Sequence, residues 1–230
     1  MLKVMLNEVR TGGLFRVILI ILFVTLFIEG ICAYFIYMDV RGSLPGGTQQ
    51  ELFYAMFHAV SAFCNAGIST LSGNMYDPLV ADKYNLHFWI AMLIIFGGLG
   101  FPIVFNYLKL LHHLLMNGIK ILIGKQKHYI HTPRIINVHT YIVVISTLIL
   151  LITGTAFYLF FEYDNTLGDL PLRGKLANAF LGAVTPRTAG YKVADMATLA
   201  PPPLMLTLLL MVIGAAHMPT AGGLQDTIGF

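Results

Sequence analysis

The chain has 230 residues, of which 57% are hydrophobic and only 11% are charged. An ordinary soluble domain carries about 25% charged residues, so this composition excludes that class and indicates an integral membrane protein. The net charge of +3 is small, and the charged residues gather between apolar segments, so no nucleic-acid partner is expected. Two cysteines, Cys32 and Cys64, are too few for a disulfide framework, and reduced thiols are expected.

Three apolar segments are long enough to cross the roughly 30 Å hydrocarbon core as helices. They are Leu14 to Met38, Phe88 to Leu111 and Val138 to Phe161. The first follows basic residues, as a signal peptide would, but it is too long and has no clear small-residue cleavage motif, so a retained membrane anchor is expected. Glycines in the second segment are expected to permit close helix packing: Gly97, Gly98 and Gly100.

The third segment ends at Glu162, which is expected to anchor the helix at the membrane interface. A fourth apolar segment, Leu204 to Ala216, follows three prolines and is too short to cross the membrane alone.

A shorter helix is expected between the first two spans, at Gln49 to Phe63. Its length of about 22 Å falls short of the membrane thickness, so the chain must enter the membrane and return. Irregular backbone at that depth is tolerated only where protein buries it or where it lines a watery cavity. The sequence FHAVSAFCNAGIST, which contains the end of this helix, therefore indicates a pore.

A related sequence follows 123 residues later, where NAFLGAVTPRTAGY aligns with AMFHAVSAFCNAGI and Gly190 aligns with Gly67. Each copy follows a long span and a polar loop, and each precedes another apolar segment. The expected fold is therefore an all-α membrane protein with two units of span, re-entrant helix, glycine-containing loop and span.

The expected units are residues 1–116 and 138–230, joined by a basic linker at 117–137. The segment from Lys109 to Arg134 contains five basic and no acidic residues. The positive-inside rule therefore places the linker and the N-terminus on the cytoplasmic side of the cell membrane, in a multi-pass topology.

These sequences resemble the Trk/Ktr/HKT superfamily of potassium transporters. The resemblance covers nearly the whole chain and is carried by FHAVSAFCNAGIS, IIFGGLGFP, AFLGAVTPRTAGY and STLILLITGTAFYLFFE. Members have four repeats around one pore, and this chain resembles the second and third.

The resemblance implies the pore-forming subunit of a potassium uptake system, with potassium as the substrate and no cofactor. It also implies a homodimer, surrounded by membrane lipid, with a cytoplasmic nucleotide-binding regulatory subunit. No metal other than potassium at the filter is expected, because the histidines near the linker lack a carboxylate or cysteine to complete a ligand set.

The two glycine-containing loops are the predicted selectivity filter. A potassium ion that enters a protein loses water, and backbone carbonyl oxygens replace that water. Glycine permits the backbone to turn its carbonyls toward the axis, and the carbonyl ends of the preceding helices carry partial negative charge. The predicted ion-binding residues are Asn65, Ala66, Gly67, Ile68, Thr188, Ala189, Gly190 and Tyr191.

A gate is predicted below the filter, where the sequence GAAHMPTAGGLQDTIGF interrupts the fourth apolar segment. The run keeps the Thr-Ala-Gly-Gly of the resembling family but departs from its pattern at His217, Met218, Pro219 and Gln225. A static kink is the alternative. The predicted gate residues are Gly214, His217, Thr220, Ala221, Gly222 and Gly223.

Two other functions stay open. Only two of four filter positions are visible, and in the resembling family a serine in place of one filter glycine accompanies sodium permeability, so a sodium-permeable pore is an alternative. Half a ring also leaves a pore open to lipid, so an incomplete, non-conducting subunit or membrane scaffold is another. An enzyme is not expected, because His58 and Cys64 share one loop region without a complete catalytic set.

Overall fold

The computed structural model describes residues 11–100, 103, 138–187, 189–195 and 198–217. All regular structure within these ranges is helical, as the sequence predicts. The basic linker, Thr188 and the gate residues from Thr220 onward lie outside the described residues.

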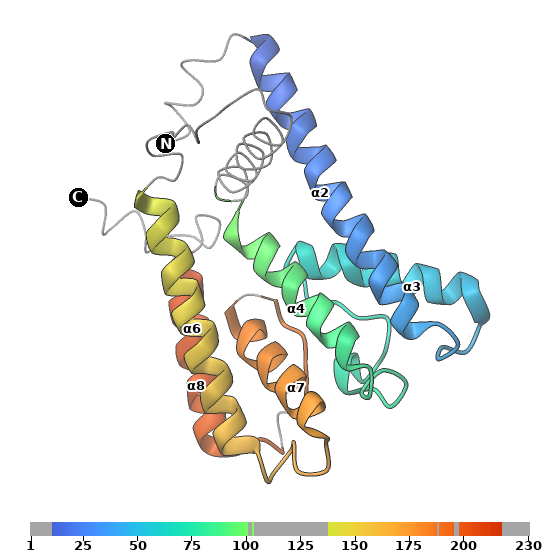
Figure 1. Cartoon of the computed structure of the whole chain (residues 1–230), viewed down its shortest axis with the longest axis vertical. Coiled ribbons are helices and arrows are strands. Elements are labelled where there is room, and N and C mark those ends of the chain that lie inside the picture. Colours follow the sequence, from blue (N-terminus) through green and yellow to red (C-terminus); the bar gives the residue numbers. More distant parts are fainter. Residues whose placement is uncertain (1–10, 101–102, 104–137, 188, 196–197, 218–230) are drawn as a thin grey trace, which may run out of the picture.

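The first half of the chain consists of a long helix, a short helix and a second apolar helix (Figure 1). These are α2 (Thr11–Val40), α3 (Gly47–Phe63) and α4 (Tyr84–Leu99), with the one-turn helix η1 (Asn74–Tyr76) between α3 and α4. The predicted short helix is thus present, and it begins two residues earlier than expected. The three helices pack against one another, with α3 lying across α2 (Figure 1).

The second half repeats this order of elements. α6 (Val138–Glu162) is followed by the short helix α7 (Leu172–Val184), the one-turn helix η2 (Thr185–Arg187) and α8 (Pro201–His217). Proline suits the first turn of α8, because the amide hydrogens there have no partner within the helix. α6 packs against both α7 and α8, and α8 runs alongside α6 in Figure 1.

The two halves meet where α4 packs against α7. The rings of Phe88 on α4 and Phe180 on α7 stack with centroids 6.3 Å apart. Gly174 on α7 lies against the ring of Tyr84, which leaves no space for a Cβ atom there. Segments distant in the sequence therefore form one packed interface.

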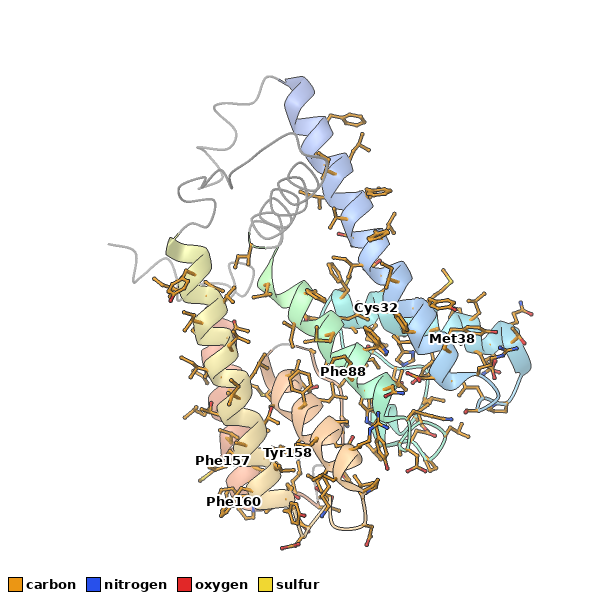
Figure 2. The ribbon with its side chains drawn as sticks, viewed as in Figure 1. Cys32, Met38, Phe88, Phe157, Tyr158 and Phe160 are labelled. Carbon is orange, nitrogen blue, oxygen red and sulfur yellow. The ribbon has the colours of Figure 1, made fainter. Side chains whose placement is uncertain are left out.

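Two of the described helices are long and apolar enough to cross a membrane: Ile18–Val40 and Tyr141–Glu162, with mean hydropathies of 2.5 and 2.3. Much of their apolar surface faces outward. On α6, Phe160 is 78% exposed whereas Tyr158 is buried against Gly182 of α7, and Figure 2 shows the two side chains on different flanks of the helix. Such exposed apolar faces suit a hydrocarbon solvent.

Within the expected span from Phe88 to Leu111, helix α4 stops before Gly100, and residues 101–102 and 104–111 lie outside the described residues. The helix begins at Tyr84 and ends at Leu99, because Gly100 adopts a φ of +76° and a ψ of 154°. The sequence offers a reason, since Pro102 disfavours helical backbone in the residue before it and removes an amide donor.

Gly97 has the packing role that the sequence predicts. A Cβ atom at this position would overlap the carbonyl oxygen of Phe63, the last residue of α3. The absence of a side chain at Gly97 therefore brings α4 directly against the end of α3, which is where the first predicted ion-binding loop begins.

Candidate functional site

The two glycine-containing loops lie against each other, although Gly67 and Gly190 are far apart in the sequence. Both glycines have left-handed backbone, with φ values of +64° and +79°. A Cβ atom on Gly67 would overlap the carbonyl oxygen of Ala189 and lie 2.8 Å from the carbonyl carbon of Gly190. A Cβ atom on Gly190 would lie 3.8 Å from Cα of Gly67. The contact is therefore one of backbone against backbone.

The first loop begins as the end of α3 unwinds. The amide of Cys64 still donates to the carbonyl of Val60 at 2.9 Å, and the amide of Ala66 donates to the carbonyl of Ser61 at 2.9 Å. Asn65 has a positive φ of +53°, a conformation that asparagine tolerates better than most residues. The carbonyl end of α3, which carries partial negative charge, therefore lies directly beside the loop.

Ser61 holds Ile68 from behind the loop. The Ser61 hydroxyl donates to the Ile68 carbonyl at 2.8 Å and accepts from the Ile68 amide at 3.0 Å. The Ile68 carbonyl, one of the predicted ion ligands, thus already has a hydrogen-bond partner on α3. This bond spans seven residues, and no short motif in the sequence indicates it.

The second loop is anchored differently. The amide of Ala189 donates to the carbonyl of Thr185 at 3.0 Å, and Ala189 is buried while Gly190 is exposed. The buried side chain of Tyr191 points back to α3, where its hydroxyl donates to the His58 carbonyl at 3.5 Å. Tyr191 therefore connects the second loop to the helix that precedes the first.

Asn74 joins the two loops from the segment between α3 and α4. Its side-chain amide donates to the Gly67 carbonyl at 3.4 Å, and its side-chain oxygen accepts from the Lys192 amide at 3.4 Å. The Met75 amide adds a bond to the Lys192 carbonyl at 3.2 Å. Asn74 was missed at the level of sequence, although asparagine after glycine is a common turn signal.

Glu162 is not an interfacial anchor, because its side chain is fully buried. One carboxylate oxygen accepts from the Thr166 hydroxyl at 2.7 Å and from the Asn165 side-chain amide at 2.9 Å. The other accepts from the backbone amide of Ala200 at 2.9 Å. A buried carboxylate needs several donors to be stable, and here these donors tie the end of α6 to the start of α8.

Two of the predicted gate residues fall within the described part of the chain. Gly214 lies in the last turns of α8, and His217 is its final residue. Both cysteines are free, as expected, with Cys32 buried and Cys64 exposed. Within the described ranges, no group of three or more His, Cys, Asp or Glu side chains is placed to hold a metal ion.

Comparison with known proteins finds similarity along almost the entire chain. Residues 5–228 match the TrkH family, which is described as cation transport protein. The chain is 34% identical over 197 residues to the Ktr system potassium uptake protein B of Vibrio alginolyticus. This alignment covers 83% of this chain and 38% of that protein.

Two further relatives are matched over nearly all of this chain. Identity is 31% over 224 residues to the Ktr system potassium uptake protein B of Bacillus subtilis, covering 96% of this chain and 45% of the relative. Identity to the potassium/sodium uptake protein NtpJ of Enterococcus hirae is 33% over 229 residues, covering 98% of this chain and 45% of the relative. The chain thus spans less than half the length of these relatives.

The backbone contact between the loops predicts unequal effects of alanine at three glycines with positive φ. Gly42 has φ +77° and open space around its Cβ position, so Gly42→Ala should cost only the backbone strain of about 1–2 kcal/mol. Gly190→Ala should behave similarly, whereas Gly67→Ala must also displace the Ala189 backbone and should cost clearly more. Thermal unfolding of the detergent-solubilised protein measures these differences; equal midpoints for Gly67→Ala and Gly42→Ala would contradict the contact.

Proposed function

We propose, because this chain belongs to the TrkH family of cation transport proteins, that it supplies two of the four repeats of a potassium-conducting pore. The observation that carries this proposal is the backbone contact between the Gly67 and Gly190 loops. Two loops that meet without side chains between them can present carbonyl oxygens to a common path. The family is one of cation transporters rather than enzymes.

The mechanism follows from the cost of removing water from a cation. Carbonyl dipoles replace hydration oxygens without fixing a full negative charge, so the ion can enter and also leave. In the first loop, the Asn65 and Ala66 carbonyls are the favoured ion ligands, because the Gly67 and Ile68 carbonyls already accept hydrogen bonds from Asn74 and Ser61. The second loop contributes Thr188, Ala189 and Gly190. The ion needs no organic cofactor in this mechanism.

Potassium is the proposed ion, with a sodium-permeable pore as the second candidate. The names of the two Ktr relatives mention potassium uptake, and the name of the Enterococcus hirae relative mentions potassium and sodium. A glycine stands at both visible filter positions, which favours potassium in the resembling superfamily. The scaffold alternative applies only if the rest of the pore is missing from the assembled protein.

The assembly we propose is a homodimer in the cell membrane with a cytoplasmic nucleotide-binding regulatory subunit. The second copy of the chain and the regulatory subunit are both inferred from the resemblance to potassium uptake systems. The orientation comes from the basic segment between the halves, which favours a cytoplasmic linker and N-terminus.

Selectivity tests the filter assignment. Gly190→Ser places a side chain in the space beside Gly67 and should lower the ratio of potassium to sodium uptake by the complete transporter in proteoliposomes. Gly42→Ser is the matched control, because it imposes a similar backbone strain at a glycine outside both loops, where the added side chain meets open space. An unchanged ratio of potassium to sodium uptake in folded Gly190→Ser protein would contradict the filter assignment. Absence of any ion uptake by the unaltered transporter would favour the scaffold.

Labelling tests the orientation. A cysteine introduced at Gln126 should react with a membrane-impermeant thiol reagent only from the cytoplasmic side, because positively charged loops stay inside. Inverted and right-side-out vesicles give the two accessibilities directly. Labelling in right-side-out vesicles would place the linker outside and reverse the proposed topology.

A deletion tests the gate. The residues after α8 include Thr220, Ala221, Gly222 and Gly223, which we propose form a loop that blocks the path until the regulatory subunit displaces it. Removing residues 218–221 should raise basal potassium flux and weaken its regulation. Flux that stays low and regulated, in protein that still reaches the membrane, would leave a static kink as the explanation.

A further inference from the structure

His58 lies in the second half of α3, directly behind the first ion-binding loop, and its side chain is fully buried. The ring stacks on Tyr54 with centroids 3.8 Å apart, and Phe57 lies edge-on to it at 5.6 Å. These two neighbours restrict the rotation of the imidazole. Both of its nitrogens nevertheless have hydrogen-bond partners, one on α3 and one in the loop.

The Tyr54 carbonyl fixes the tautomer of a neutral His58 ring, and that tautomer sets the direction of the bond to Ser69. Nδ1 lies 2.8 Å from the Tyr54 carbonyl oxygen, which can only accept, so Nδ1 carries the hydrogen. In a neutral imidazole Nε2 is then an acceptor, and it receives the Ser69 hydroxyl at 3.0 Å. The Ser69 oxygen in turn accepts from the Leu71 amide at 3.1 Å. We call this set of four groups the His58 relay.

The relay fixes the end of the first loop. Ser61 holds Ile68 and His58 holds Ser69, so two consecutive loop residues are fixed by side chains of the same helix. A neutral His58 also places no positive charge beside the loop, where a cation would repel potassium. The carbonyls before Ile68 are thereby held in position without any contact between His58 and the ion.

The second loop reaches the same residue from the other half of the chain. The Tyr191 hydroxyl donates to the His58 backbone carbonyl at 3.5 Å, and the two rings lie 6.4 Å apart. Tyr191 directly follows Gly190, the residue that meets Gly67. One turn of α3 therefore supports both loops, through the side chain of His58 for the first and through its carbonyl for the second.

We propose that His58 is a positioning residue for ion selection, which acts through the hydrogen bond to Ser69 and not through contact with the ion. This proposal rests on the proposed function, because it assigns His58 a role in a potassium pore. It predicts that His58 and Ser69 act as one unit, so that removing either side chain has the same effect as removing both.

The experiment compares variants of the complete transporter in proteoliposomes. His58→Asn keeps an amide donor near the Tyr54 carbonyl but leaves no acceptor for Ser69. His58→Gln can place an amide oxygen near the former Nε2 position. Ser69→Ala removes the hydroxyl from a half-buried loop position. It tests the same hydrogen bond if the His58 variants fail to fold. Ser72→Ala is the matched control, on an exposed serine of the same segment.

His58→Asn and Ser69→Ala should each lower the ratio of potassium to sodium uptake by about two- to tenfold, the factor that corresponds to one hydrogen bond. The double variant should show no further loss, and His58→Gln should regain most of the wild-type ratio. Wild-type ratios in Ser69→Ala, or effects that multiply in the double variant, would overturn the proposal.

A second measurement does not depend on transport. Cys64 is exposed at the start of the loop, so its rate of reaction with a thiol reagent, after replacement of any other accessible cysteines, monitors the loop directly. The rate should rise in His58→Asn and Ser69→Ala but not in Ser72→Ala. If wild-type protein takes up no potassium while these rates still change, the proposed function fails and the positioning role of His58 stands. Unchanged rates would overturn the positioning role.

Discussion

The arrangement of this chain depends on the direct contact of the Gly67 backbone with the backbone of Ala189 and Gly190. A contact of this kind requires that Gly67 carry no side chain, and the left-handed backbone of both Gly67 and Gly190 favours glycine at these positions. The positions of α3, α4 and α7 are consistent with this contact. The loops that follow α3 and α7 meet, and α4 packs against both helices, through the missing side chain of Gly97 and the stacked rings of Phe88 and Phe180.

Irregular backbone within an apolar protein needs hydrogen-bond partners that water does not supply there. Side chains of α3 and of the segment after the first loop provide them, through Ser61, His58 and Asn74. The partners differ between the halves, since the first loop is held by its own helix and the second reaches across through Tyr191. Two similar sequences therefore each place a left-handed glycine in a loop, and the two loops have different supports.

The sequence was sufficient to predict what depends on local chemistry and on repetition: the short helix α3, the need for glycine at Gly67 and Gly190, and the order of elements in each half. It did not predict contacts that span the chain, such as Ser61 with Ile68 or Glu162 with Ala200, because no periodicity or motif encodes them. Helix α4 shows a third case. Hydropathy alone favours one continuous helix, and the break at Gly100 comes from backbone geometry that the hydropathy pattern does not register.

The buried carboxylate of Glu162 holds α8 at one end only. Its bond to the amide of Ala200, the residue before α8, fastens the start of α8 to the end of α6. A helix of 17 residues is about 25 Å long at 1.5 Å per residue, so a tilt of about 5° around this fixed end displaces the far end by about 2 Å. Such a tilt would displace the end of α8 near His217 most, and it would also act on η2, which packs against α8 and leads into the second loop.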